Sequence, residues 1–146
     1  MDYSKGAEEL LKYLIELERN GYIIQGNISE IAKGEIAVIN FLRVEGDGVT
    51  PARISQEFNI NTSRVAAILN SLSKKGYIER KANPNDKRKT NVYITDQGRE
   101  YGKCKKDDIL EKLSRTLELL GDDDAKEYIR IMGKIKNIIF EEQMKR

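Results

Sequence analysis

The sequence predicts a mainly α-helical fold that contains one short β-hairpin. Apolar residues recur at helical spacing in several segments, and two neighbouring short runs are rich in β-branched and aromatic residues. Gly and Asn-Gly turns separate these segments from one another. A length of 146 residues is that of one domain with extensions, so we expect residues 1–146 to form a single domain.

Two helices are expected before residue 50. The first is predicted from Tyr3 to about Ile24, and Ser29 is expected to cap a second helix that ends near Val44. The residues predicted to face inward are Ala7, Leu10, Leu11, Leu14 and Leu17 in the first helix, and Val38, Ile39 and Leu42 in the second.

Residues 50–76 have the pattern of two short helices joined by a tight turn. Thr50 followed by Pro51 predicts the start of a helix that ends near Phe58. Asn59 suits a left-handed turn, and Asn61 can cap the next helix, which stops at Gly76. The apolar stripe of this second helix consists of Val65, Ile68, Leu69 and Leu72. The arrangement is that of a helix-turn-helix.

A hairpin is predicted directly after this pair of helices. Residues 77–80 and 91–94 have strand composition, and the polar, basic loop between them contains the turn Asn83-Pro84-Asn85-Asp86. A helix-turn-helix followed by such a hairpin is a winged helix, in which the loop is the wing. We expect residues 30–95 to form this lobe.

Long helices are expected on the other side of the hairpin. Thr95 is predicted to cap a helix that ends near Leu120, and Asp122 opens a last helix after Gly121. The winged core is too small to cover the apolar faces of these helices and of the first one. Burial between two copies of the chain solves this problem, so residues 3–24 and 96–143 are expected to form a two-fold homodimer.

The composition excludes several functions. The chain has no histidine and one cysteine, Cys104, which removes His-based catalysis, an intrachain disulfide and imidazole or thiolate zinc sites. We therefore expect no enzyme, no catalytic residue, no cofactor and no metal. No apolar run could cross a membrane and no signal peptide is evident, so we expect a cytoplasmic protein without a membrane partner.

Positive charge is concentrated in the middle of the chain. The net charge is +2, but residues 50–95 carry 9 Lys/Arg against 3 Asp/Glu, whereas residues 1–49 carry 5 against 9. A basic middle is expected of a protein that binds nucleic acid. The alternative is a surface charge distribution without function, and the count does not separate the two.

The helix from Asn61 to Lys75 has a small, polar outer face. It contains no Asp or Glu, and Asn70 points away from the apolar stripe together with Ala67. Small side chains allow close approach to the major groove, where Asn or Arg can read base edges, and Thr62 with Ser63 suits phosphate contacts. The alternative is a solvent-exposed face that happens to lack acids.

The wing carries three consecutive cations after Asp86. Cations on such a loop suit the minor groove or the phosphate backbone, and Asp86 can orient Arg88 through a carboxylate–guanidinium pair. The alternative is a solvated basic turn. The DNA-binding residues predicted from the helices and the wing are Arg53, Asn61, Thr62, Ser63, Arg64, Ala67, Asn70, Lys74, Asp86, Lys87, Arg88 and Lys89.

These motifs resemble the MarR family of transcriptional regulators. The similarity covers the helix-turn-helix at 54–65, the joint at 72–80, and the wing pattern Asp86-Lys87-Arg88 followed by Thr95-Asp96-Gln97-Gly98. The order of the flanking helices also fits. One departure is Asn59, where many relatives have a glycine that asparagine can replace.

The resemblance implies a homodimer whose two winged helices enter successive major grooves of double-stranded DNA. It assigns contacts to Ser63 and Arg64 in the recognition helix and to Asp86 with Arg88 in the wing. It also implies a small aromatic or anionic effector bound between the dimer helices and the DNA-binding lobe. Tyr13, Phe41 and Arg53 could line that pocket, although packing or a phosphate contact explains each of them as well.

We therefore expect a transcriptional regulator, a ligand-responsive repressor that binds a pseudo-palindromic operator. One alternative is a winged helix used for protein–protein contact without an operator. Another is a regulator that senses oxidants through Cys104, as some relatives do through a cysteine near the first helix. Cys104 lies after the wing instead, and we expect it to be a partly buried structural thiol.

Overall fold

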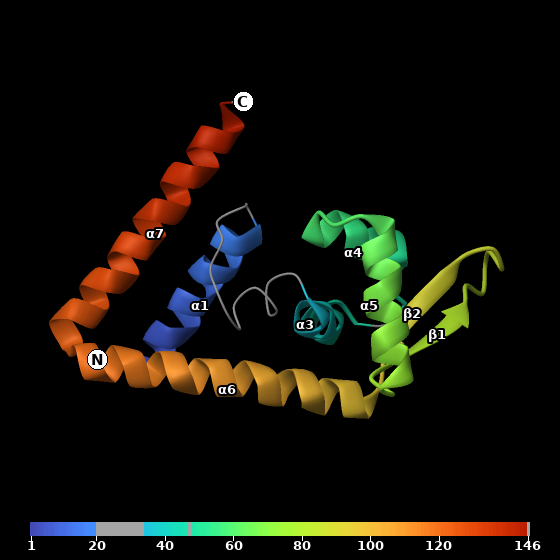
Figure 1. Ribbon diagram of the computed structural model, residues 1–146, viewed down its shortest axis with the longest axis horizontal. Coiled ribbons are helices and arrows are strands. Elements are labelled where there is room, and N and C mark those ends of the chain that lie inside the picture. The colour runs from blue at the N-terminus through green and yellow to red at the C-terminus, as the bar shows by residue number, and fades with distance from the viewer. Residues whose placement is uncertain (20–33, 47, 146) are drawn as a thin grey trace. The chain divides into compact units, whose positions relative to one another are not determined.

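The computed structural model describes residues 1–19, 34–46 and 48–145. Its elements are α1 (Tyr3–Arg19), α3 (Glu35–Glu45), α4 (Pro51–Phe58), α5 (Thr62–Lys74), β1 (Ile78–Ala82), β2 (Thr90–Ile94), α6 (Asp96–Leu120) and α7 (Asp122–Met144) (Figure 1). The described part of the chain is thus mainly helical with one small antiparallel hairpin, which confirms the predicted fold class.

The chain divides into two compact units, which are described separately. One comprises Met1–Ser29 and Lys106–Arg146, and the other comprises Glu30–Lys105. Helix α6 contributes residues to both units. The second unit contains the helix-turn-helix and the hairpin, and we call it the winged-helix unit. The first contains α1 and α7, and we call it the helical unit.

Side-chain caps define the helix-turn-helix as predicted. The Thr50 hydroxyl accepts a hydrogen bond from the Arg53 backbone N–H at 3.2 Å at the start of α4, beside Pro51. Asn59 ends α4 with a left-handed φ of 51°. The Asn61 side chain then accepts from the Arg64 N–H at 2.8 Å and starts α5. Because each cap satisfies an N–H that the helix itself leaves unpaired, both helix starts are fixed locally.

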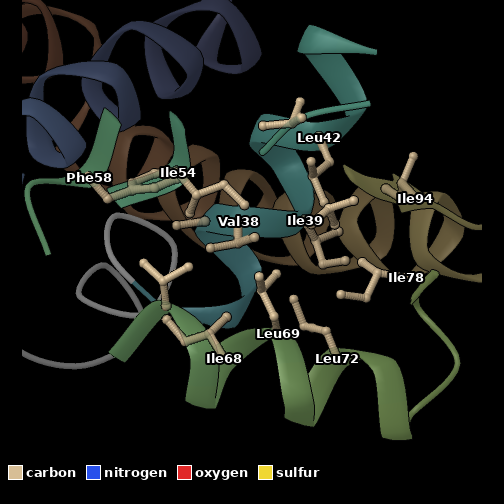
Figure 2. Close-up of a cluster of buried hydrophobic side chains, with 14 residues drawn as sticks. Val38, Ile39, Leu42, Ile54, Phe58, Ile68, Leu69, Leu72, Ile78 and Ile94 are labelled. Carbon is tan, nitrogen blue, oxygen red and sulfur yellow. The ribbon is translucent and has the colours of Figure 1, made fainter. Parts of the chain in front are cut away.

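The core of the winged-helix unit lies between α3, α5 and the hairpin. Figure 2 shows Val38 and Ile39 of α3 on the side toward Leu69 and Leu72 of α5, with Leu42 further along α3. The buried cluster also includes Ile54, Phe58, Val65, Ile68, Ile78, Val92 and Ile94. The predicted inward positions of α3 and α5 are all buried. This packing holds the opposite, polar face of α5 toward solvent.

The hairpin is antiparallel, and its register pairs Ile78 with Ile94 and Arg80 with Val92. Val49 adds a short bridge to Val92, with N–H to carbonyl distances of 3.2 and 2.7 Å. Strand β1 extends two residues further into the loop than the sequence predicts, to Ala82. Strand β2 begins one residue earlier than predicted, at Thr90. They leave residues 83–89 as the wing.

The joint between α5, the hairpin and α6 is closed by Thr95. Its hydroxyl donates to the Gly76 carbonyl at 2.7 Å and accepts from the Gly98 N–H at 3.0 Å, so one side chain both caps α6 and ties it to the end of α5. Tyr77 stacks on Tyr101 with ring centroids 4.3 Å apart. These contacts give a structural reason for the Thr-x-x-Gly pattern that follows the wing.

One predicted helix bound needs correction. Helix α1 is described as far as Arg19, and both the predicted end near Ile24 and the predicted cap Ser29 lie outside the described residues. Helix α3 begins at Glu35 after Gly34, which makes no side-chain cap hydrogen bond. Ile36 and Ala37 in its first turn are buried, and no side-chain cap marked this start in the sequence.

An ion pair links α3 to the last turn of α5. Lys75 Nζ lies 2.9 Å from Glu35 Oε2. Partial burial raises the pKa of Glu35, but hydrogen bonds from Ser71 and Lys75 and the Lys75 charge outweigh it and hold that pKa below its usual value. A carboxyl group with a lowered pKa stabilises the fold above its unfolded-state pKa, and this contribution is lost as the pH falls through the folded-state pKa.

We therefore expect Glu35→Gln to lower the free energy of unfolding at pH 7 by about 0.5–1 kcal/mol, since Lys75 is half exposed and its pairing is screened. The difference between the two proteins should shrink below about pH 4.5, where Glu35 begins to be protonated in the unfolded chain. Urea unfolding at pH 7 and pH 3 measures it. An equal difference at both pH values would contradict an electrostatic origin.

The helical unit packs α1 against α7. All five predicted inward residues of α1 are buried, and so is Leu117 of α6. Gly6 permits the close approach, because a Cβ there would lie 3.0 Å from Ile129 Cδ1. The apolar faces of α6 and α7 are only partly covered: Leu119 is 71% exposed, Ile138 55% and Ile131 42%. These exposed side chains leave an apolar surface on the helical unit.

Candidate nucleic-acid interface

One face of α5 combines exposure with the absence of acidic residues. Burial of Val65, Ile68, Leu69 and Leu72 turns the other side of the helix outward, because 3.6 residues make one turn. The predicted contact residues exposed on this helix and at its start are Asn61, Thr62, Ser63, Arg64, Ala67, Asn70 and Lys74. The structure therefore brings these residues together on one surface. Because α5 contains no Asp or Glu, no side chain of this helix repels phosphate there.

The start of α5 is suited to phosphate. Asn61 uses its side chain to cap the helix, so its direct role is to define the first turn. Thr62 and Ser63 are exposed in that turn, where backbone N–H groups and the helix dipole favour an anion. Phosphate contacts of this kind set the register of a recognition helix without reading sequence.

The wing is organised by Asn83. Its side-chain oxygen accepts from the backbone N–H groups of Asn85 at 2.8 Å and Asp86 at 3.3 Å. Its backbone N–H donates to the Lys89 carbonyl at 2.9 Å, and Lys89 N–H donates to the Asp86 carbonyl at 3.0 Å. An internally hydrogen-bonded loop of this kind presents Lys87, Arg88 and Lys89, all exposed, from a defined backbone.

Asp86 holds Arg88. Its Oδ1 accepts from the Arg88 backbone N–H at 3.1 Å and from Arg88 Nε at 3.2 Å. Asp86 itself is partly buried, whereas the Arg88 side chain is 92% exposed. Because Nε is bound, the terminal nitrogens of the guanidinium are directed outward from the wing. The geometry that the sequence suggested for this pair is present.

We expect Arg88→Ala to weaken binding to duplex DNA about tenfold or more, since a charge-assisted contact of an exposed arginine contributes about 1.5–3 kcal/mol. Asp86→Ala should also weaken binding, although it removes a negative charge, because it frees Arg88 to move. Fluorescence anisotropy with a labelled duplex measures both. Circular dichroism should show that both variants fold, and tighter binding by Asp86→Ala would show that Asp86 only repels phosphate.

Arg53 is more engaged than the sequence indicated. Its Nη1 donates to Glu57 Oε2 at 2.8 Å, its Nη2 lies 3.9 Å from Glu45 Oε1, and its guanidinium covers the Phe41 ring at 5.2 Å. The hydrogen bond to Glu57 raises the pKa of Arg53 above its usual value. A phosphate contact would have to compete with these two carboxylates.

The three residues suggested for an effector pocket are divided between the units. Arg53 and Phe41 are in contact in the winged-helix unit, where Phe41 also meets Phe58 edge to face at 5.5 Å. Tyr13 belongs to the helical unit, donates to Glu9 at 2.6 Å and lies under Lys136 at 5.0 Å. Each therefore has packing partners within its own unit.

Cys104 is exposed, which contradicts the expectation of a partly buried thiol. Gly102 faces α3, since a Cβ there would lie 2.5 Å from Ile39 Cγ2. Cys104 lies two residues further along the helix than Gly102, which is a rotation of about 200°. It therefore lies on the opposite, outer side of α6. Its Sγ lies 3.4 Å from Glu100 Oε1.

Sequence reasoning missed Arg80. Its Nη1 donates to Asn70 Oδ1 on the outer face of α5 at 2.8 Å. The signal was present in the strand alternation, because Arg80 lies two residues after the buried Ile78 and so shares its face of the hairpin. Locating the partner also requires the packing of the hairpin on α5.

The described residues contain no group of three or more His, Cys, Asp or Glu side chains placed to hold a metal ion. Within the same ranges, no helix has the length and apolar character needed to cross a membrane.

A helix-turn-helix whose second helix exposes a polar face, followed by a basic hairpin loop, defines a winged-helix protein. Residues 31–89 match the family model described as "MarR family". This match covers the winged helix, which is therefore similar to those of the MarR family of transcriptional regulators.

Individual known proteins also resemble this chain. An "Uncharacterized HTH-type transcriptional regulator YdgJ" of Bacillus subtilis (strain 168) is 25% identical over 109 residues, which cover 75% of this chain and 66% of that protein. The chain thus spans 66% of the length of this relative. Among solved structures, YusO from Bacillus subtilis has a TM-score of 0.66 at 20% identity, with 91% of this chain and 85% of YusO covered.

A second solved structure is that of Streptococcus pneumoniae FabT in complex with DNA. It has a TM-score of 0.60 and 25% identity, and the similarity covers 89% of this chain and 85% of FabT. A MarR transcriptional regulator from Methanosarcina mazei Go1 has a TM-score of 0.58 at 21% identity, with 98% of this chain and 91% of the other covered.

Proposed function

We propose that this chain is a transcriptional regulator that binds double-stranded DNA as a homodimer. The observation that carries the proposal is the exposed face of α5, which lacks acidic residues and is followed by a wing with three exposed cations. An α-helix fits into the major groove, and the wing cations suit the adjacent backbone or minor groove. The complex of the similar FabT with DNA supports this reading.

The proposed dimer forms through the helical unit. Exposed apolar residues on α6 and α7, among them Leu119, Ile131 and Ile138, supply a surface that a second copy can bury. A two-fold dimer presents two recognition helices to half-sites about 34–36 Å apart, so the proposed operator is a pseudo-palindrome. The proposed outcome is repression, since a dimer bound across a promoter blocks access to it.

Regulation by a ligand is part of the proposal. A small aromatic or anionic effector that prefers a dimer with a different spacing between the recognition helices would weaken DNA binding. The attainable change is bounded by the difference in its affinity for the two states.

The salt dependence of DNA binding tests the proposal. If each subunit neutralises about three phosphates, the slope of log K against log[salt] should be about −5 for the dimer. Titration of a labelled duplex from about 50 to 300 mM KCl measures it. A protein that binds no duplex at low salt, or binds with a flat slope, would indicate a winged helix used for protein–protein contact instead.

A further inference from the structure

Arg80 and Asn70 form a hydrogen-bonded pair on the proposed recognition surface. Arg80 Nη1 lies 2.8 Å from Asn70 Oδ1, and both side chains are exposed. Asn70 comes from the outer face of α5, and Arg80 from the face of β1 that also carries the buried Ile78. The hairpin thus supplies a side chain to the recognition helix.

The chemistry of the pair fixes the orientation of the Asn70 amide. A guanidinium has N–H donors and no acceptor, so the atom that faces it must be the amide oxygen. If the Asn70 amide were reversed, its NH2 group would face the N–H groups of the Arg80 guanidinium. The amide nitrogen of Asn70, with its two donors, is therefore the group left for another partner.

This orientation changes which base Asn70 can read. Asparagine recognises adenine when its oxygen accepts from N6 and its nitrogen donates to N7. Here the oxygen already faces a cation, and an approaching N6 amino group would meet the positive guanidinium as well. Guanine presents two acceptors, O6 and N7, in the major groove, and both are attracted by N–H donors and by positive charge.

The surroundings add donors. Asn70 and Arg80 line a surface hollow together with Ser71, Ser73 and Lys74, and no acidic residue is among these described lining residues. The Ser71 hydroxyl already donates to Glu35, the Ser73 hydroxyl can donate or accept, and the lysine and arginine only donate. The hollow thus favours an electron-rich base edge.

We propose that Arg80 is a specificity-determining residue, which turns Asn70 into a donor so that the pair recognises guanine O6 and N7. The inference rests on the proposed function, because it concerns the same surface of α5. The hairpin would then take part in sequence readout through Arg80, in addition to the DNA-backbone contacts proposed for the wing.

Selection of binding sites from a randomised duplex library tests the inference. The wild-type protein should select G·C over A·T at one base pair of each half-site, by about fivefold or more. In Arg80→Met, which keeps a long side chain without donors, the preference at that base pair should fall to below about threefold or turn to A·T. Asn70→Ala should lose the same preference, and the double variant should resemble Asn70→Ala, as expected of coupled residues.

Lys81→Met is the matched control. Lys81 is the next residue of β1, on the opposite face, and its Nζ lies 5.3 Å from the Tyr93 ring centroid. Its substitution removes one cation from the same strand and should leave the base preference unchanged. Thermal unfolding should show that all variants fold, since every replaced side chain is exposed.

Two outcomes would overturn the inference while the proposed function stands. One is an Arg80→Met variant that binds all sequences more weakly by the same factor, as expected of a phosphate contact alone. The other is selection of adenine by the wild-type protein at the base pair that Asn70→Ala affects. A wild-type protein that binds no duplex would overturn the proposed function itself, and with it this inference.

Discussion

Gly98→Ala is expected to unfold the winged-helix unit at ordinary temperatures. A Cβ at Gly98 would lie 2.2 Å from the Tyr77 carbonyl oxygen and 3.0 Å from Ile94 Cγ1. The carbonyl cannot turn away, because it accepts the Thr95 N–H at 3.1 Å. Overpacking against side chains costs about 1–3 kcal/mol, and a backbone clash at this distance should cost more. Total stabilities are only about 5–15 kcal/mol, so this single methyl group is decisive.

Gly102→Ala is the matched comparison, since it makes the same chemical change one turn later in α6. Its Cβ would lie 2.5 Å from Ile39 Cγ2, a buried methyl group on a branched Cβ, so this overpacking should cost about 1–3 kcal/mol without a backbone clash. Replacing a helical glycine by alanine also gains about 1 kcal/mol of helix propensity. Urea unfolding followed by circular dichroism should therefore show a clearly smaller loss for Gly102→Ala. A Gly98→Ala protein as stable as the wild type would mean that α6 can move away from the Tyr77 carbonyl.

Local chemistry made the helix-turn-helix predictable. Thr50 and Asn61 cap α4 and α5 through their own side chains, and Asn59 takes the left-handed conformation. Each signal acts within a few residues, so the sequence alone reveals it. The start of α3 carries no such signal, because Gly34 has no side chain to cap it. Ile36 and Ala37 at its start are buried, and burial depends on the rest of the fold.

The candidate interface likewise contains features that local sequence predicts and features that depend on tertiary packing. The outer face of α5 follows from helical periodicity, and the Asp86–Arg88 pair follows from a spacing of two residues. The Asn70–Arg80 pair depends on how the hairpin packs on α5, which no local pattern specifies. The exposure of Cys104 depends on the rotational phase of α6, which is set by the contact of Gly102 with α3.

Replacing both Ile131 and Ile138 by glutamate is expected to convert the proposed dimer into a folded monomer. The two residues are 42% and 55% exposed on the helical unit. They are seven residues apart, so they lie within about 20° of each other around α7. Charges there would remain solvated in a single chain but would be buried without a partner in a dimer.

The effect should be large because a two-fold interface repeats each substitution. The double variant places four carboxylates in one dimer, and at about 1 kcal/mol each the dissociation constant would rise about 1000-fold. Sedimentation at micromolar concentration should then show a monomer. Met144→Glu is the control, because Met144 is 89% exposed and lies about 140° around the helix from Ile131. It should remain a dimer.

DNA binding connects this surface to the winged helix. A monomer can occupy one half-site only, so it should make half of the phosphate contacts of the dimer, and the salt slope should fall from about −5 to about −3. Loss of the second half-site should also lower the affinity far more than Arg88→Ala does, since every contact of one subunit is lost at once.

A double variant that stays dimeric would place the interface elsewhere, and one that unfolds would show that Ile131 and Ile138 support the helical unit itself. A monomer that keeps the full salt slope would mean that one winged helix makes all the contacts, so that the pseudo-palindromic operator would have to be abandoned.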